Sequence, residues 1–268
     1  MDIKLAKAFI VEKNYSPKII YNFFKYQLFG YRTVIKKLPL FKIYLNSNNG
    51  FYDNFINVFN YSEYLTERII KKEVKKGFNI LDVGANIGYF TLLFSKLVGK
   101  NGKVSSFEPQ IGIYEQFKKN LKINQIKNVN SYNFGISNKN KKVVLYKDPK
   151  NLGNSSVYKL QKEFVKEKVE FKNPLNLINH KIDLIKIDVE GYELNVLKTL
   201  LPIIDKYKPV IIFEFSSKHL NKIGKNEDKK ILNFLRKINY DYYDINNETS
   251  VLSKNVHTNL ICKFKKIK

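Results

Sequence analysis

The segment Asn79–Lys96 constrains the fold of this chain more than any other part. Its sequence, NILDVGANIGYFTLLFSK, places a short apolar run before a turn of small residues and an amphipathic stretch, Tyr89–Leu97. This order predicts a strand, a glycine turn and a helix, the first crossover of a nucleotide-binding α/β sheet. Gly84 lets the backbone turn tightly, and Gly88 lets the helix start pack closely on the strand.

An acidic residue, Asp82, lies at the carboxyl end of this predicted strand. Open α/β sheets bind their ligands at that edge. A carboxylate there would oppose a pyrophosphate and would suit a cationic ligand. The turn therefore favours a ligand that carries an amine or a sulfonium over a dinucleotide.

Length and composition are those of a globular chain of 268 residues with 44% hydrophobic residues, long enough to bury a sizeable core. No apolar stretch is long enough to span a bilayer, and the charged N-terminus lacks the pattern of a secretory signal. One cysteine excludes an intramolecular disulfide, and the three histidines show no metal-ligand spacing, so no metal site is predicted. These features favour a reducing, cytoplasmic location.

The formal net charge of +24 raises the question of a nucleic-acid partner. Only three of the 48 basic residues are arginine, and the chain is rich in Asn, Ile, Tyr and Phe but lacks Trp. That bias is typical of AT-rich coding sequence, whereas groove readout favours arginine. We therefore expect nucleic acid not to be the acceptor, although the charge still favours peripheral contact with an anionic membrane surface.

Strands and helices alternate from Asn79 onward, which predicts right-handed βαβ units and a mostly parallel sheet with helices on both faces. The last two strands are separated only by a turn, so the C-terminal one is expected to be antiparallel. The predicted strands are Ile80–Val83, Lys103–Glu108, Val129–Phe134, Ile182–Asp188, Pro209–Phe215, Tyr240–Ile245 and His257–Phe264. The predicted helices are Tyr89–Leu97, Ile113–Ile123, Glu193–Leu200 and Lys229–Ile238.

The segments outside this alternation are less regular. The sequence of residues 1 to about 40 predicts one or two helices. One of them is Lys18–Phe29, for which Ser16 is the predicted cap and Pro17 the first helical residue. A short strand is predicted over Phe41–Leu45 and a helix over Tyr61–Lys75. The lysine-rich stretch Asn138–Phe171 has no clear period, which predicts a strand plus a mobile insertion near the site.

A second acidic residue, Glu108, ends the next strand about two dozen positions after the glycine turn. At this spacing an acid is placed to accept hydrogen bonds from both hydroxyls of a ribose. Pro109 ends the strand behind it.

A third cluster lies in the run IDLIKIDVEGYE, from Ile182 to Glu193. Lys186 stands inside the strand, where a charge is costly unless it is paired or used. Asp188 and Glu190 end the strand, and neighbouring carboxylates raise each other's pKa, which suits a general base. Glu193 is interpreted instead as a first-turn acid favoured by the helix dipole.

The fifth strand carries Glu214 in an otherwise apolar run, and His219 follows after a short loop. Either group could take a proton from a substrate hydroxyl. We interpret His219 as a loop histidine and keep Glu214 with Asp188 and Glu190 as the predicted catalytic carboxylates.

The runs LDVGANIGYF, FEP and IKIDVEGYE resemble, in this order, the motifs of the FkbM family of S-adenosylmethionine-dependent methyltransferases. The resemblance covers about Tyr61–Phe264, and Asn86 has the form typical of the family. It implies a Rossmann-like class I methyltransferase fold, which with the strands above gives a mostly parallel seven-stranded sheet in residues 61–268. Residues 1–60 match no pattern of the family, and we expect them to form an N-terminal helical and strand extension on the acceptor or membrane-surface side.

The resemblance also implies S-adenosylmethionine as cofactor and O-methylation of a hydroxyl. The positions that match cofactor contacts are Asp82, Gly84, Asn86 and Glu108, with Gly88 beside them. The expected acceptor is a sugar or glycan, including a lipid-linked one, or a small molecule. Neither the acceptor nor the oligomeric state follows from the sequence.

Two other functions remain open at this point. The charge would suit an RNA methyltransferase. Base-amine methyltransferases usually grip a flipped base with an Asp/Asn-Pro-Pro-aromatic motif, which is replaced here by Asp188-Val189-Glu190-Gly191, so ribose 2′-O-methylation is the RNA alternative that stays open. A basic membrane-surface protein with a vestigial cofactor fold is the other alternative, which would place the chain at the inner face of the membrane.

Overall fold

The computed structural model describes Tyr21, residues 33–46, 50–149, 151–160, 162–246, 249–250, 252 and 256–265. The helix predicted over Lys18–Phe29 lies outside these residues, apart from Tyr21. No helix among the described residues is long and apolar enough to cross a membrane.

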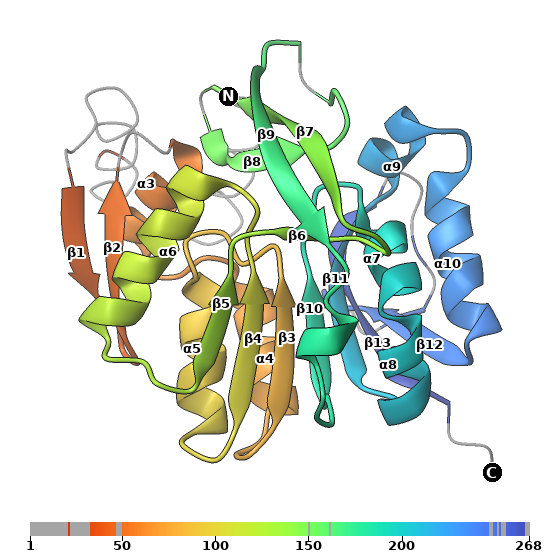
Figure 1. The fold of residues 1–268 in the computed structure, drawn as a ribbon, viewed down its shortest axis with the longest axis horizontal. Coiled ribbons are helices and arrows are strands. Elements are labelled where there is room, and N and C mark those ends of the chain that lie inside the picture. Colours follow the sequence, from red (N-terminus) through yellow and green to blue (C-terminus); the bar gives the residue numbers. More distant parts are fainter. Residues whose placement is uncertain are drawn as a thin grey trace.

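The centre of the molecule is a seven-stranded sheet with the order β12-β13-β11-β10-β3-β4-β5 (Figure 1). All neighbours pair in parallel except at β13, which is antiparallel to both β11 and β12. The strands are β3 (Asn79–Val83), β4 (Lys103–Phe107), β5 (Val129–Tyr132), β10 (Leu184–Ile187), β11 (Val210–Ser216), β12 (Tyr240–Asp244) and β13 (His257–Phe264). The predicted mostly parallel sheet with an antiparallel C-terminal strand is confirmed.

Helices cover both faces of this sheet, as predicted. One face packs on α4 (Tyr64–Glu73) and α5 (Tyr89–Val98), and α6 (Ile111–Ile123) also joins that core. The other face packs on α7 (Glu193–Thr199), α8 (Leu201–Tyr207), α9 (Ser217–Ile223) and α10 (Glu227–Lys237). Because β3 and β10 are covered on both sides, all or nearly all of their residues are buried, which explains why they are mostly apolar apart from Asn79 and Asp82 in β3 and Lys186 in β10.

The turn between β3 and α5 has the conformation that its small residues predict. Gly84, Asn86 and Gly88 all have positive φ angles, of 82°, 52° and 89°. A Cβ atom at Gly88 would lie 2.2 Å from the Phe117 ring, so only glycine allows α6 to pack against the start of α5. The sequence predicted close packing of this glycine against the strand, and the close contact in the structure is with Phe117 of α6 instead.

The N-terminal region differs from the prediction. Residues 33–37 form a strand, β1 (Thr33–Lys37), which pairs antiparallel with β2 (Lys42–Asn46), so the helical interpretation of residues up to about 40 is wrong here. The side chains of Asn120 and Asn124 on α6 bind the backbone of β2 through hydrogen bonds. The β1–β2 hairpin is thus a separate two-stranded sheet that hydrogen bonds attach to the α6 region. It is followed by a helix that the sequence did not predict, α3 (Phe51–Phe59).

The lysine-rich segment also differs from its prediction. It forms most of a second, four-stranded sheet of order β6-β9-β7-β8, which stands above the carboxyl edge of the central sheet (Figure 1). Its strands are β6 (Gly135–Ile136), β7 (Lys141–Asp148), β8 (Asn151–Ser156) and β9 (Val165–Lys172). The apolar side chains Leu145, Val169 and Phe171 pack together on one face of this sheet. The segment is therefore an ordered sheet rather than one strand with an irregular insertion.

Candidate functional site

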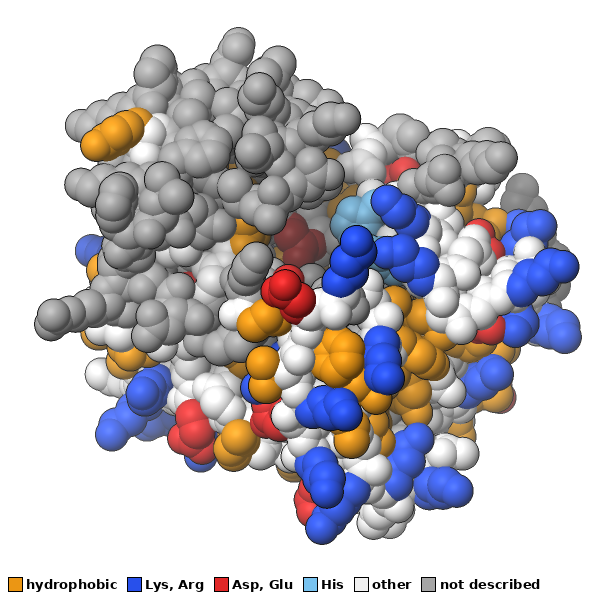
Figure 2. All heavy atoms as spheres, turned by 90° about the horizontal axis from the view of Figure 1, so that it is seen from above, with side chains coloured by type: hydrophobic (Ala, Val, Ile, Leu, Met, Phe, Trp, Pro, Cys, Tyr) orange, Lys and Arg blue, Asp and Glu red, His pale blue; other side chains and the backbone are white. Residues whose placement is uncertain are grey.

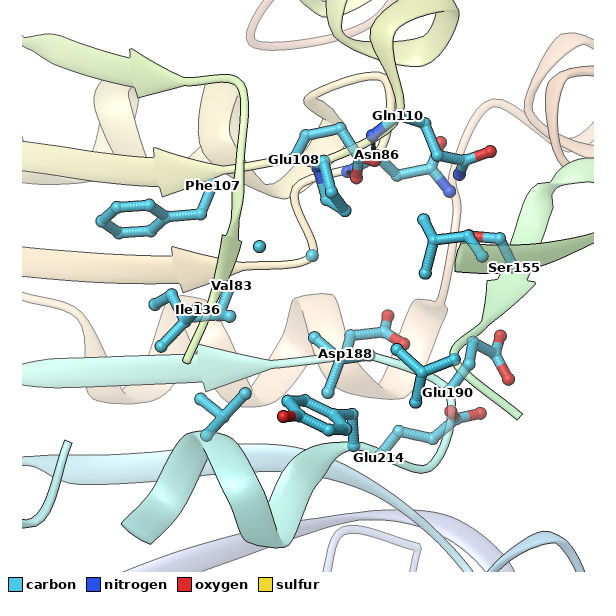
Figure 3. Close-up of a pocket in the computed structure, with 18 of the residues that line it drawn as sticks. Val83, Asn86, Phe107, Glu108, Gln110, Ile136, Ser155, Asp188, Glu190 and Glu214 are labelled. Carbon is cyan, nitrogen blue, oxygen red and sulfur yellow. Dashed lines mark hydrogen bonds between the residues drawn. The ribbon is translucent and has the colours of Figure 1, made fainter. Parts of the chain in front are cut away.

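A pocket opens at the carboxyl ends of β3, β4, β10 and β11, beneath the four-stranded sheet (Figure 3). Residues from the predicted motifs line one part of its wall, and the segments that the sequence left unassigned line the rest. The lining residues include Gly84, Asn86, Glu108, Gln110, Ile136, Leu145, Ser155, Phe171, Asp188, Glu190, Tyr192 and Glu214. The pocket has two ends that differ in chemistry.

Glu108 defines the first end, which we call the Glu108 end together with Gly84, Asn86 and Gln110. Its side chain is 4% exposed. One carboxylate oxygen accepts the backbone N–H of Asn86 at 3.0 Å, and the other accepts that of Gln110 at 2.9 Å. Each oxygen keeps a lone pair for a further donor, which is the arrangement expected for two neighbouring hydroxyls.

Burial raises the pKa of Glu108 to about 7, and the two backbone donors only partly offset this effect. The two backbone hydrogen bonds therefore do not fully compensate the burial of the charged carboxylate. Hydroxyl donors from a ligand would stabilise the ionised form.

Gly84 joins the two ends of the pocket. A Cβ atom here would lie 1.8 Å from the backbone oxygen of Asp188, so the turns after β3 and β10 approach more closely than any other residue would allow. The predicted tight turn at Gly84 is confirmed.

Asp82 and Gly88 are not among the residues that line the pocket, so their contact with a cofactor stays a prediction. Asp82 is fully buried, and one of its carboxylate oxygens accepts a hydrogen bond from the Thr91 hydroxyl. Burial raises the pKa of Asp82. Both residues lie behind the pocket wall. Gly88 allows the conformation of the turn, and Asp82 places a buried acid beneath it.

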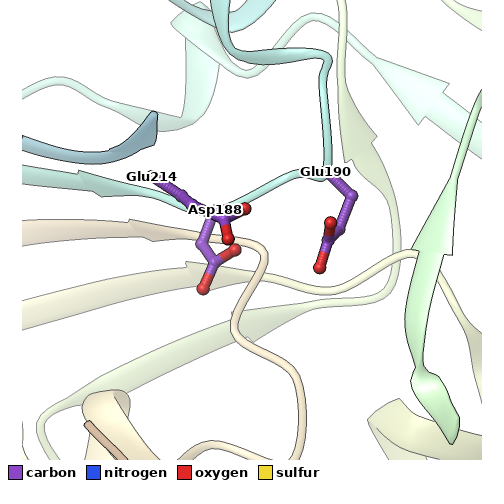
Figure 4. A group of neighbouring side chains, drawn as sticks. All are labelled: Asp188, Glu190 and Glu214. Carbon is purple, nitrogen blue, oxygen red and sulfur yellow. The ribbon is translucent and has the colours of Figure 1, made fainter. Parts of the chain in front are cut away.

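The predicted catalytic carboxylates Asp188, Glu190 and Glu214 lie together at the second end, which we call the acidic end (Figure 4). One oxygen from each lies within 4.8 Å of the others. They come from the end of β10, the turn after it and β11. The sequence predicted this meeting correctly, since neighbouring parallel strands end at the same edge.

The protonation of this cluster is shifted. Burial and the neighbouring Asp188 raise the pKa of Glu190 to about 8. Burial and the charges of Glu190 and Asp188 raise the pKa of Glu214 well above its usual range. These effects favour the protonated form of both carboxyl groups, and Glu190, with a pKa of about 8, can exchange a proton near neutral pH, as a general base must.

The turn that presents Glu190 is held from two sides. Glu193, the first residue of α7, accepts hydrogen bonds from the backbone N–H groups of Val189 and Gly191. The Ser156 hydroxyl at the end of β8 donates to the Glu190 carbonyl at 2.6 Å. Glu190 itself has a φ angle of 50°, a strained value for a residue with a side chain. Glu193 is thus a structural first-turn acid, and the turn is fixed rather than free.

The histidines lie at the edge of the acidic end. His257 at the start of β13 places its Nε2 3.6 Å from a Glu214 oxygen, and the His219 ring centroid lies 6.0 Å from that of His257. His219 belongs to the first turns of α9 rather than to a loop, and it does not line the pocket.

Tyr52 and Glu63 also line the pocket, although the sequence did not single them out. Tyr52 lies on α3, and its hydroxyl accepts a hydrogen bond from Ser62 at 2.8 Å. Glu63 is held by the Thr66 hydroxyl and by the Asn259 amide on β13. No local motif marks these residues, because only the packing of the N-terminal region against the sheet brings them to the site.

The lining residues fit adenosylmethionine at the Glu108 end, where a buried carboxylate with spare lone pairs faces the pocket. The acidic end could hold a cation or the hydroxyl and amine groups of an acceptor. Among the lining residues of the described chain there are five acids, Glu63, Glu108, Asp188, Glu190 and Glu214, but no lysine or arginine.

Comparison with known proteins gives the family. A family model described as the Methyltransferase FkbM domain matches residues 82–242, more than half of the chain. Methyltransferase 1 of Beauveria bassiana is 26% identical over 144 residues, which cover 45% of this chain and 57% of that protein. Methyltransferase sdnD of Sordaria araneosa is 30% identical over 153 residues, which cover 44% of this chain and 59% of that protein. The match thus spans less than two thirds of either relative.

Two solved structures have similar chains. A methyltransferase FkbM from Methylobacillus flagellatus KT aligns with a TM-score of 0.47 and 17% identity, over 71% of this chain and 44% of that one. An rRNA-methylase, described as putative, from Clostridium thermocellum aligns with a TM-score of 0.49 and 16% identity, over 75% of this chain and 94% of that one.

Proposed function

Because the chain belongs to the FkbM methyltransferase family, we propose that it binds S-adenosylmethionine at the Glu108 end and methylates a hydroxyl held at the acidic end. The observation that carries this proposal is the pocket itself. One of its ends has a buried carboxylate that could accept hydrogen bonds from a ribose, and its other end, across the turn at Gly84, has three carboxylates that could accept a proton. When bound, adenosylmethionine would supply a methyl group on its sulfonium sulfur, which an acceptor oxygen can take up with adenosylhomocysteine as the leaving group.

The residues of the chain would have separate tasks. Glu108 would accept the two ribose hydroxyls, while Asn86 keeps the Glu108 carboxylate in place through its backbone N–H. Glu190 and Glu214 would receive the proton that the acceptor hydroxyl loses as its oxygen forms the new bond to carbon. The four-stranded sheet would exclude water from above, and alignment of the two ends would supply much of the rate.

The acid-lined wall favours a neutral or cationic acceptor. A phosphate next to the reacting hydroxyl would lie among acidic groups of which only Asp188 is ion-paired with a lysine, Lys186, and like charges repel strongly in a buried site. In RNA every 2′-hydroxyl has such a neighbour. We therefore infer that the acceptor is a glycan, including a lipid-linked one, or a small molecule with a hydroxyl.

The formal net charge of +24 is compatible with a general attraction to anionic membranes. On the coloured part of the face in Figure 2, basic side chains lie beside hydrophobic and uncharged surface.

The direct test is transfer of labelled methyl groups from adenosylmethionine to a cell lysate, followed by separation of lipid, glycan, RNA, protein and small-molecule fractions. We expect label in the glycan, lipid-linked or small-molecule fraction, and about 10²- to 10⁴-fold slower labelling with Glu190→Gln. Label in RNA that is lost with rising salt would instead support the RNA alternative. No label in any fraction, together with no binding of adenosylmethionine, would contradict the proposed function.

A further inference from the structure

A second pocket lies at the amino edge of the central sheet, opposite the edge that holds the candidate site. It opens where α5 ends and where β4 and β5 begin (Figure 1). Its volume is about 520 Å³. Ligand pockets commonly measure about 300 to 1,000 Å³, so this one could admit a small molecule.

Four lysines line this pocket, which we call the basic pocket. Lys96 and Lys100 lie at the end of α5 and just after it, Lys103 is the first residue of β4, and Lys127 precedes β5. The dipole of α5 favours a cation near its C-terminus, which accounts for Lys96 and Lys100. It does not account for Lys103 and Lys127, which come from two other segments. The lysines therefore converge on the pocket for a reason beyond the stability of one helix.

No acid balances these charges within the described part of the chain. All four lysines are exposed, and none of them forms an ion pair with a described residue. No Asp or Glu is among the described residues that line the pocket. Like charges around one pocket repel one another, and an anion bound between them would relieve that repulsion.

The wall of the basic pocket is held in place by Asn128. Its Nδ2 donates to the backbone oxygens of Ser95 at 3.1 Å and Gly99 at 2.9 Å, and its Oδ1 accepts the Ser95 hydroxyl at 2.6 Å. The backbone oxygen of Val98 accepts the N–H of Gly77 at 2.8 Å. These carbonyl groups at the end of α5 would otherwise repel an anion, and they already have donors.

Two amide side chains add to the donors of the pocket. Gln125 and Asn130 line it together with the lysines. Neither of these side chains forms a hydrogen bond with another described residue. Phosphate oxygens accept N–H groups from several directions, and lysine is a common phosphate ligand in proteins.

We propose that the basic pocket binds a small anion that carries two or three linked phosphate groups. A single phosphate would fill little of the pocket and reach only part of the lysine set, whereas linked phosphates spread their negative charge along it. The site lies at the opposite edge of the sheet from the Glu108 end and the acidic end. Its occupation is therefore independent of the proposed methyl transfer.

The test is calorimetric titration of the full chain with pyrophosphate and with tripolyphosphate at pH 7.5. Salt at about 150 mM reduces the range of exposed charges to about 8 Å, so that scattered surface lysines contribute little. We expect saturable binding with one site per chain, tighter for tripolyphosphate than for pyrophosphate. No binding heat, or weak binding at many equivalent sites, would overturn the inference.

Two variants that lose the same charge localise the binding. The test variant carries Lys96→Gln, Lys100→Gln, Lys103→Gln and Lys127→Gln. The control variant carries four substitutions of exposed lysines on and between α9 and α10, outside both pockets: Lys222→Gln, Lys225→Gln, Lys229→Gln and Lys237→Gln.

Tripolyphosphate should bind the test variant at least about tenfold more weakly than the wild type, because four charged contacts are lost. Its affinity for the control variant should change by less than about twofold. Circular dichroism shows that both variants are folded. Equal losses in the two variants would show that only the net charge matters, and would contradict the inference.

Two further arms separate the basic pocket from other anion sites. Vesicles of phosphatidylglycerol should bind the wild type and the test variant alike. Loss of vesicle binding in the test variant, without tripolyphosphate binding by the wild type, would overturn the small-ligand site in favour of a lipid headgroup. Pyrophosphate should bind equally with and without adenosylhomocysteine, and competition between them would place the anion at the candidate site instead. If adenosylhomocysteine does not bind, the proposed function fails and the phosphate titration still decides the inference.

Discussion

The two ends of the pocket hold buried acids in opposite ways. At the Glu108 end one carboxylate accepts two backbone N–H groups, and among the described residues it belongs to no cluster of three acids. At the acidic end three carboxylates lie within 4.8 Å of one another, and one of them, Asp188, is ion-paired with the buried Lys186. The first arrangement suits a ligand of fixed shape with hydroxyl donors, and the second suits the movement of a proton. Changes at the first end should therefore alter binding, and changes at the second should alter turnover.

The largest effect is expected at the acidic end. Glu190→Gln and Glu214→Gln remove groups that can accept the proton, so methyl transfer to the labelled lysate fraction should fall by about 10²- to 10⁴-fold. The affinity for adenosylhomocysteine, measured by calorimetry, should change by less than about threefold, which is below 1 kcal/mol. Equal losses of binding and transfer would show that the two ends do not have separate tasks.

The second effect is expected at the Glu108 end. Glu108→Ala removes the acceptor of two hydroxyl hydrogen bonds to a charged group, each worth about 1.5 kcal/mol or more, so adenosylhomocysteine should bind about 100-fold more weakly. Glu115→Ala is the matched control, because Glu115 is an exposed acid on α6 outside the pocket. Unchanged affinity of Glu108→Ala would refute the ribose role.

The third effect concerns Gly84, which brings the two ends together. In Gly84→Ala the new Cβ would collide with the Asp188 carbonyl at a φ angle of 82°, so the free energy of unfolding should fall by about 2 to 3 kcal/mol. Gly112→Ala on α6 is the control, since nothing lies within 4 Å of its added Cβ and helix propensity favours alanine there by up to about 1 kcal/mol. Chemical denaturation of both variants measures the difference, and similar stabilities would contradict the close approach.

The smallest effect is a pH dependence of binding at the Glu108 end. Burial raises the pKa of Glu108 to about 7, and two hydroxyl donors require the ionised form. Binding therefore releases a proton below pH 7, and the affinity for adenosylhomocysteine should fall by up to about tenfold between pH 7 and pH 6. Calorimetry at both pH values measures this change. Glu108→Gln should bind weakly with no such dependence, and an affinity that rises on acidification would contradict the role of the ionised carboxylate.

Much of this molecule can be predicted from the sequence, because its central sheet follows short local rules. The alternation of apolar runs and amphipathic segments predicts the order of the strands and helices. Because parallel strands end at the same edge of a sheet, it also predicts that Glu108, Asp188 and Glu214 lie at one edge. The role of Asp82 could not be predicted in this way. A residue at a strand end can face the pocket or the core, and its hydrogen bond to Thr91 depends on the packing of α5.

The second sheet illustrates the other limit of sequence analysis. In β9 the buried residues Val169 and Phe171 alternate with exposed Lys168 and Glu170, which is a strand period. The pattern is short and its neighbours are rich in lysine, so it is difficult to recognise as a strand. The pairing of β9 with β7 cannot be predicted from any local motif. Tyr52 and Glu63 were missed for the same reason, because tertiary packing alone brings them to the pocket.

Calorimetric titration of the wild-type chain with adenosylmethionine at pH 7.5 tests the central claim most directly. The pocket predicts saturable binding with one site per chain, retained in Glu190→Gln and largely lost in Glu108→Ala. No binding heat with either adenosylmethionine or adenosylhomocysteine, in a protein that is folded by circular dichroism, would contradict it.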